Sequence, residues 1–188
     1  MNYPNGDRYE GELKDGVRHG RGVYTAHTGE VYVGDYRGGM RHGRGLYTLP
    51  DGTRYDGDFV NGKPNGRGVY VWSNGDIYTG DFVEDEFHGH GTWSSSRGDS
   101  YRGEFRNGKR EGTGYSITYT GNKYEGQWRG GMKEGHGIFS FSNGEKYEGQ
   151  FVANQFDGRG TYGYPTGERV LAIFEQGKLV EVLQQQEK

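Results

Sequence analysis

A repeat of 23 residues constrains this chain more than any other feature of its sequence. Tyrosine recurs at this interval seven times, and Val170 holds the eighth place. With the tyrosine counted as position 1, glycine fills positions 3, 12 and 14 of every full repeat, and position 5 holds a large side chain. Such self-similarity predicts a stack of small units that bury their apolar faces against one another. The seven tyrosines are Tyr9, Tyr32, Tyr55, Tyr78, Tyr101, Tyr124 and Tyr147.

Two further columns of the repeat predict tight turns. Position 21 is glycine in all eight occurrences, as in "LPDG" at 49–52, and position 8 is glycine in six of eight. The exceptions at position 8 are Asp85 and Asn154, which are residue types that tolerate a positive φ. Two turns in 23 residues leave two short strands, so each repeat is predicted to form a β-hairpin.

The segment "YDGDF" at 55–59 alternates between two faces, as a β-strand does. A turn centred near positions 8 and 9 places position 1 opposite 16, position 3 opposite 14 and position 5 opposite 12. Tyr55 then faces Tyr70, and Phe59 lies over Gly66, so the glycines make room for the rings. Since one hairpin is too small to be stable alone, we expect an all-β solenoid of stacked antiparallel hairpins, forming an elongated rod or curved ribbon.

The composition excludes several classes of protein. Net charge is −3, and neither half of the chain has the basic excess expected of a nucleic-acid binder. The chain has no cysteine, which excludes disulfides and thiolate metal sites. It has no apolar run of about 20 residues and does not open with a signal peptide, so we expect a cytoplasmic protein.

The repeat phase also sets the expected organisation. Residues 1–8 match positions 16–23, so we expect a piece of a longer array that opens inside a hairpin. Repeats begin at 9, 32, 55, 78, 101, 124 and 147, and a degenerate repeat begins at 170. We expect a single array over residues 1–178, followed by a cap or tail over 179–188.

The C-terminal stretch "RVLAIFEQGKLVEVLQQQEK" is the most aliphatic of the chain, and apolar residues there occupy positions that are polar elsewhere. Two interpretations are open. The tail folds back over the sheet edge as an intramolecular cap, or the same residues form a homodimer contact, since an uncovered apolar edge favours aggregation. The candidate interface residues are Leu171, Ile173, Phe174, Leu179, Val182 and Leu183.

Motifs of catalysis or cofactor binding are missing from the sequence. There is no phosphate-binding G-x-x-x-x-G-K-[ST] and no G-x-S-x-G. His19 and His42 lie in neighbouring repeats, about 10 Å apart by strand spacing, which is too far for one zinc ion. We therefore expect no cofactor, no metal and no enzymatic activity.

Basic residues recur at positions 10 and 13 and suggest a second function. Such a ladder would suit anionic lipid headgroups. The alternative is charge pairing across strands with acids such as Asp35 and Asp58. The candidate lipid-binding residues are Arg18, Arg21, Arg41, Arg44 and Arg67.

The pattern Y-x-G-x-[FLWY]-x-x-G-x-x-x-G-x-G resembles the MORN repeat (membrane occupation and recognition nexus), as "YEGQWRGGMKEGHGIF" at 124–139 illustrates. The resemblance covers nearly the whole chain and weakens at the last repeat, where Val170 and Ala172 replace tyrosine and glycine. No catalytic domain is attached, so the chain looks like repeat-only members, in particular the C-terminal part of a cytoskeletal scaffold of protozoan parasites.

This resemblance implies a non-enzymatic scaffold in a cytoskeletal, membrane-proximal assembly, which homodimerises through its terminal repeats and docks partner proteins. The alternative is a module that binds phosphoinositides or other anionic lipids. A partner helix or extended segment is expected to lie along the aromatic columns. These candidate groove residues are Tyr55, Phe59, Tyr78, Phe82, Tyr101, Phe105, Tyr124, Trp128, Tyr147 and Phe151.

Overall fold

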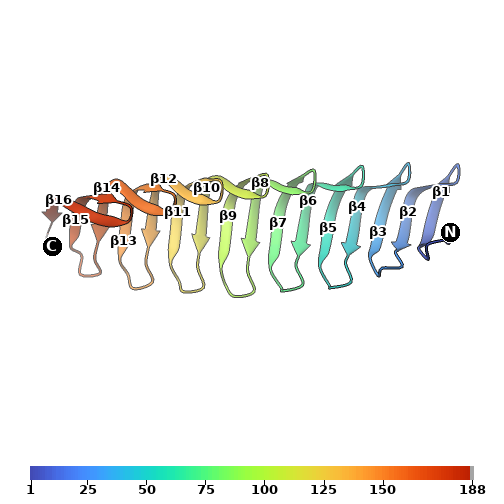
Figure 1. Cartoon of the computed structure of the whole chain (residues 1–188), viewed down its shortest axis with the longest axis horizontal. Coiled ribbons are helices and arrows are strands. Elements are labelled where there is room, and N and C mark those ends of the chain that lie inside the picture. The colour runs from blue at the N-terminus through green and yellow to red at the C-terminus, as the bar shows by residue number, and fades with distance from the viewer. Residues whose placement is uncertain (187–188) are drawn as a thin grey trace. The chain divides into compact units, whose positions relative to one another are not determined.

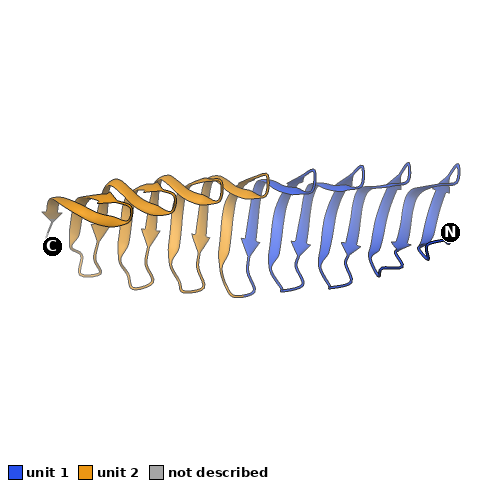
Figure 2. Ribbon diagram, in the orientation of Figure 1, with its two compact units in different colours: residues 1–96 blue, residues 97–188 orange. Residues whose placement is uncertain are grey.

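The computed structural model describes residues 1–186, and every regular element in that range is a β-strand (Figure 1). The chain divides into two compact units, Met1–Ser96 and Arg97–Lys188 (Figure 2). Unit 1 contains β1 (Arg8–Lys14), β2 (Val17–Thr25), β3 (Val31–Arg37), β4 (Met40–Thr48), β5 (Arg54–Val60), β6 (Lys63–Val71), β7 (Ile77–Val83) and β8 (Glu86–Ser94). Unit 2 contains β9 (Ser100–Arg106), β10 (Lys109–Ile117), β11 (Lys123–Arg129), β12 (Met132–Ser140), β13 (Lys146–Val152), β14 (Gln155–Gly163), β15 (Arg169–Glu175) and β16 (Lys178–Gln186).

Within each unit, every strand pairs antiparallel with the next strand along the chain. The predicted all-β fold of stacked hairpins is therefore confirmed. The rod or ribbon shape of the whole array stays a prediction.

The turns form where the glycine columns predict them. In the β5–β6 hairpin, Asn61 and Gly62 have φ values of 51° and 89°, the pair of positive angles that a two-residue type I′ turn requires. Asp85 and Asn154, which replace glycine at position 8, have φ values of 78° and 74°. The other connection contains Gly52 at φ 88°. Both turn predictions are correct.

The strand register is as predicted in the middle of the hairpin and wrong at its end. Tyr55 lies opposite Tyr70 and Gly57 opposite Gly68, but a bulge follows and Phe59 pairs with Pro64 instead of Gly66. Gly66 has a φ of 109°, and β6 carries two extra residues at this bulge, which shifts the pairing.

The predicted pairing of position 5 with position 12 occurs between repeats instead. Phe59 lies opposite Gly43 of the preceding hairpin. The same arrangement pairs Tyr36 with Gly20.

The core of each hairpin is a tyrosine ring that lies on glycine backbone. A Cβ atom added to Gly68 would lie 2.6 Å from Cζ of Tyr55, so only glycine fits beneath this ring. The Tyr55 hydroxyl donates a hydrogen bond to the backbone oxygen of Asp58 at 3.0 Å. The prediction that glycines make room for rings is correct, with the position-1 tyrosine as the covering ring.

Position 5 joins one repeat to the one before it. Phe59 makes edge-to-face contacts with Tyr55 of its own repeat and with Tyr32 of the preceding repeat, both with centroids 5.1 Å apart. Leu13 occupies the same position on β1, where the described residues include no preceding hairpin, and it is 47% exposed. Position 5 is therefore buried where a preceding hairpin covers it and exposed on β1.

The C-terminal stretch continues the sheet. Strand β16 pairs with β15, with Val182 opposite Ala172 and Leu179 opposite Phe174. Residues 178–186 therefore complete the last hairpin, and the expected boundary at 178/179 falls inside it. Leu179, Val182 and Leu183 are 45%, 52% and 43% exposed, so the described part of the tail does not fold back to bury them.

Candidate functional site

Each hairpin has two chemically different faces. We name the face that carries positions 1, 5, 10 and 16 the ring face; in the β5–β6 hairpin these are Tyr55, Phe59, Pro64 and Tyr70. The opposite face carries positions 2, 4, 13 and 15, and we name it the charged face. This division follows from the alternation of buried and exposed residues along the strands.

The ten aromatic residues predicted to line a partner groove are the floor of the ring face. All ten are buried, with exposed fractions between 0% and 7%. Burial raises the pKa of core tyrosines, for Tyr101 and Tyr124 to about 12, so these hydroxyls stay protonated at neutral pH. A partner on this face would contact the half-buried side chains at positions 10 and 16 above that floor. The ten are Tyr55, Phe59, Tyr78, Phe82, Tyr101, Phe105, Tyr124, Trp128, Tyr147 and Phe151.

Position 10 places arginines over these rings in unit 1. The guanidinium carbon of Arg18 lies 5.0 Å from the Tyr24 ring centroid, and its Nη2 donates to the backbone oxygen of Gly39 at 2.8 Å. The guanidinium carbon of Arg41 lies 4.6 Å from the centroid of Tyr47 and 5.4 Å from that of Phe59. Both arginines are therefore cation–π partners of the ring face.

Two adjoining pockets open on this face of unit 1. The first, of about 320 Å³, is lined by Arg18, Tyr24, Glu30 and Arg41, among others. The second, of about 200 Å³, is lined by Phe59, Pro64, Tyr70 and Asp85. Arg41, Tyr47 and Gly62 line both, so the pockets form one continuous groove, which we name the ring groove.

Beyond the second pocket the ring face becomes aromatic. Tyr70 and Trp72 have ring centroids 4.7 Å apart, and Trp72 lies 5.7 Å from Phe87. Phe87, which holds position 10 in its repeat, stacks on Tyr78 with a centroid separation of 3.9 Å. None of these half-buried rings except Tyr70 stood out in the sequence. Trp72 and Phe87 hold positions 18 and 10, which are not aromatic in every repeat, so the repeat pattern did not single them out.

Unit 2 has the same order of chemistry along its own ring face. Arg110 lies over Trp128, with 5.1 Å from the guanidinium carbon to the centroid, and Lys133 lies over Phe139, with 4.4 Å from Nζ. Burial lowers the pKa of Lys133, and the charge of Arg110 lowers it further. Phe139 then begins an aromatic cluster, which continues with Phe141 at 4.7 Å and includes Phe156.

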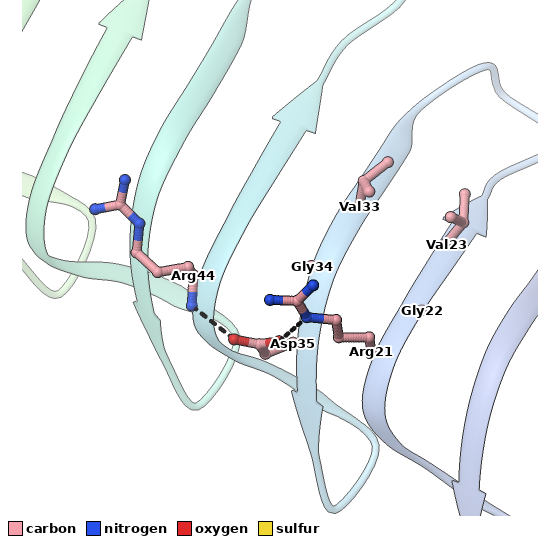
Figure 3. Close-up of a pocket in the computed structure, with 7 residues that line it drawn as sticks. All are labelled: Arg21, Gly22, Val23, Val33, Gly34, Asp35 and Arg44. Carbon is pink, nitrogen blue, oxygen red and sulfur yellow. Dashed lines mark hydrogen bonds and ion pairs between the residues drawn. The ribbon is translucent and has the colours of Figure 1, made fainter.

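The charged face of unit 1 pairs its arginines with aspartates. Arg21 lies 3.7 Å from Asp35, and the backbone nitrogen of Arg44 donates to the same carboxylate at 3.2 Å (Figure 3). Arg21, Asp35 and Arg44 line a pocket of about 360 Å³ on the charged face, together with Val23 and Val33. Farther along the face, Arg44 lies 3.6 Å from Asp58.

This arrangement corrects the prediction of one basic ladder. Arg18 and Arg41 lie on the ring face, whereas Arg21, Arg44 and Arg67 lie on the charged face. Positions 10 and 13 are three residues apart, so strand alternation turns them to opposite sides of the sheet. The three arginines of the charged face adopt the cross-strand pairing that was the alternative interpretation.

The predicted dimer residues lie together on β15 and β16. Phe174 is buried at 3% exposure, Leu171 and Ile173 are half-buried, and the remaining three are exposed. This gives the last described hairpin a row of exposed aliphatic side chains on β16, which also includes Val180.

A buried carboxylate occupies the connection that precedes β1. Asp7 accepts hydrogen bonds from the Tyr24 hydroxyl, from the His27 backbone nitrogen at 2.9 Å and from the His27 ring at 2.8 Å. These bonds, that of Tyr24 foremost, hold the pKa of Asp7 well below its usual range. The cluster ties consecutive repeats together on one edge.

The described residues contain no group of three or more His, Asp or Glu side chains that could hold a metal ion. Among the same residues, no helix is long and apolar enough to cross a membrane.

Comparison with known families settles the class of this repeat. The family described as the MORN repeat matches seven consecutive segments, which together run from residue 9 to residue 169. The chain belongs to the MORN-repeat family. The matched segments begin at residues 9, 32, 55, 78, 101, 124 and 147, as the tyrosine column predicts.

Solved structures with a fold like that of this MORN array include the TCP domain of SAS-4 (dCPAP) from Drosophila melanogaster, in complex with a proline-rich motif of Ana2 (dSTIL). The two are 10% identical with a TM-score of 0.50, over 83% of this chain and 85% of that one. The wild-type TCP10 domain of Danio rerio CPAP matches with 18% identity and a TM-score of 0.36, over 100% of this chain and 99% of that one. No curated protein matches the chain.

Proposed function

We propose that this MORN-repeat protein is a non-enzymatic scaffold of a cytoskeletal, membrane-proximal assembly in the cytoplasm. It docks partner proteins along its ring face and homodimerises through its C-terminal repeats. The observation that carries the proposal is the ring groove, in which half-buried rings and cations line a continuous hollow across consecutive repeats of unit 1. A repeated fold suits this role because one docking surface recurs with each hairpin.

The fold comparison supports protein docking. The SAS-4 TCP domain is described in complex with a proline-rich motif of another protein. Since this chain shares the fold of stacked hairpins, we infer that its ring face can also hold an extended segment of a partner protein.

The dimer proposal rests on β16. This strand exposes Leu179, Val182 and Leu183, and a strand at the edge of a sheet readily pairs with another chain. We therefore propose that two copies associate through β15 and β16, burying the aliphatic row against its counterpart.

Light scattering in solution tests the dimer. The wild type should have twice the mass of one chain, and Val182→Asp with Leu183→Asp should give monomers. Val83→Asp with Val152→Asp is the matched control, because it adds the same charge at two exposed valines outside β16 and should stay dimeric. A wild-type monomer, or a dimer that survives the paired substitution, overturns this interface.

Cell fractionation tests the setting. Expressed at native level, the tagged protein should remain with the detergent-insoluble cytoskeleton. Recovery in the detergent-soluble fraction alone would contradict a cytoskeletal scaffold.

Binding of anionic lipid is the second candidate, favoured by Arg18 and Arg41, whose charges lie on the ring face without a salt bridge among the described residues. Sedimentation with phosphoinositide vesicles at physiological salt tests it. Binding that Arg18→Glu with Arg41→Glu abolishes, while Arg21→Glu with Arg44→Glu leaves it intact, would favour the lipid function.

A further inference from the structure

The chemistry of the ring face changes along unit 1 in a fixed order. Position 10 holds Arg18 and Arg41 in the first two repeats, and Pro64 and Phe87 in the next two. The surrounding side chains also become more aromatic along this order. Single tyrosines lie beside the arginines, whereas Tyr70 lies in a cluster with Trp72 and Phe87. The position-10 column of the ring face is therefore cationic at one end and apolar at the other.

The two arginines of the ring groove differ from Arg21, Arg44 and Arg67 of the charged face in whether a carboxylate lies beside them. Arg41 lies over rings and has no carboxylate within 4.0 Å among the described residues, whereas Arg44, three residues later, lies 3.6 Å from Asp58. Among the described residues, Arg18 likewise has no carboxylate that close, and its Nη2 donates a hydrogen bond to the backbone oxygen of Gly39. A carboxylate from a ligand would add a charge-assisted hydrogen bond that the folded chain does not supply.

The acids that line the groove do not cancel these charges. Glu30 accepts a hydrogen bond from the Tyr47 hydroxyl at 2.6 Å. Burial raises the pKa of Asp85, and Arg41 and Lys63 act against that rise. Together the two pockets are lined by four cations (Arg18, Arg41, Arg54 and Lys63) and two acids. Lys63 forms a salt bridge with Glu84 at 2.7 Å, so the arginines supply the positive charge with which a ligand can pair.

The spacing of the repeats sets the spacing of a ligand. Two strands per repeat advance the sheet by about 10 Å, and an extended peptide advances about 3.3 Å per residue. One repeat therefore matches about three residues of a partner. A β-strand turns side chains three residues apart to opposite faces, whereas a polyproline II segment, with three residues per turn and a rise of about 3.1 Å, keeps them on one face. Side chains of a partner that meet successive repeats are then three residues apart.

We propose that the ring groove of unit 1 binds an extended acidic–apolar segment of a partner protein. Two carboxylates three residues apart meet Arg18 and Arg41, and large apolar side chains at the next two three-residue steps enter the pocket at Pro64 and Tyr70 and contact Phe87. The proposal rests on the protein-docking part of the proposed function and names the chemistry of the partner.

A second occurrence of the same order supports this assignment. Arg110 and Lys133 stand 92 residues after Arg18 and Arg41, and the next position-10 residue is Phe156. The triplet Gly-Gly-Met at 38–40 also recurs at 130–132 with this spacing. Four repeats, two cationic and then two apolar, are therefore the unit of the pattern.

Fluorescence polarisation with a labelled synthetic peptide tests the proposal on the full chain. The probe has about 12 residues, with aspartates three residues apart followed by phenylalanines at the next two three-residue steps and prolines elsewhere, which favour the polyproline II conformation. A second probe carries the reverse order, since the groove does not fix the direction of the peptide. One of the two should bind saturably, and moving its aspartates next to each other should weaken binding.

Matched substitutions locate the contact. Arg41→Glu should weaken binding at least about tenfold. Arg44→Glu is the matched control, because it reverses the charge of an arginine on the same strand but on the charged face, and it should change binding by less than about twofold. Arg41→Gln removes the positive charge without adding a negative one and should weaken binding as well. Circular dichroism shows which variants are folded, and the Gln variant carries the test if the Glu variant unfolds.

Three results would overturn the proposal. The first is that neither probe binds. The second is that Arg44→Glu weakens binding as much as Arg41→Glu. The third is that phosphoinositide vesicles bind through Arg41 while the probes do not, which assigns the groove to lipid. The scaffold function is judged separately, by solution mass and cytoskeletal fractionation. A dimer in the cytoskeletal fraction that ignores both probes refutes the groove's ligand alone.

Discussion

Arg41 lies over the ring of Tyr47, with 4.6 Å between the guanidinium carbon and the ring centroid. This contact places a cation on the face of the sheet that also carries the aromatic floor. On the opposite face, Arg21, Arg44 and Arg67 are instead paired with aspartates.

The glycines beneath the core tyrosines should be intolerant of any side chain. Gly68→Ala places a methyl group 2.6 Å from Cζ of Tyr55, and overpacking of this kind costs about 1–3 kcal/mol. Gly163→Ala is the control, because its added carbon meets nothing closer than 3.8 Å. Urea unfolding should show a loss for Gly68→Ala and little change for Gly163→Ala; equal midpoints would contradict the packing described.

The ion pairs of the charged face should contribute little to stability. Arg67 lies 3.5 Å from Asp81, but both side chains are solvent-accessible and water screens their attraction. Arg67→Ala should therefore change the free energy of unfolding by less than about 1 kcal/mol. Thermal melting checks this, and a large loss would show that the charged face holds the hairpins together.

Acid should destabilise the chain partly through Asp7. Its pKa is lowered in the folded state, so the carboxylate contributes stability above its unfolded pKa of about 4 and loses it as pH falls below that value. Asp7→Asn should lower stability at pH 7 and make its decline between about pH 5 and 2 shallower. Melting temperatures measured across that range check the prediction, and parallel profiles for the two proteins would refute it.

Alkali should unfold the chain through its buried tyrosines. Burial raises the pKa of Tyr101 and Tyr124 to about 12, above the unfolded value of about 10. The folded state is therefore fully favoured below pH 10 and loses stability as pH rises through 12. Phenolate absorbance should rise together with the loss of circular dichroism. Ionisation of these tyrosines at pH 10 with the fold intact would contradict their burial.

The sequence was sufficient for the repeat and for much of the register. The glycines at positions 8 and 21 require positive φ, so the turns could be located, and the aromatic pair Tyr55 and Tyr70 fixed the centre of the hairpin. The bulge could not be found in this way. Gly66 was interpreted as space for a ring, whereas its backbone angle displaces the register.

The basic ladder was a separate error. Positions 10 and 13 are three residues apart, so strand alternation alone puts Arg41 and Arg44 on opposite faces. The strand at 178–186 was also missed, because its residues lack the glycine columns that mark the other hairpins. Only the backbone geometry showed that strand and the bulge.

The central claim is that partners dock on the ring face, and amide chemical-shift mapping with the acidic–apolar peptide tests it most directly. We expect the largest shifts at Gly39 and Gly62, whose backbone lines the ring groove, and little change at Arg21 and Val33 on the charged face. The largest shifts at Arg21 and Val33 would contradict the account.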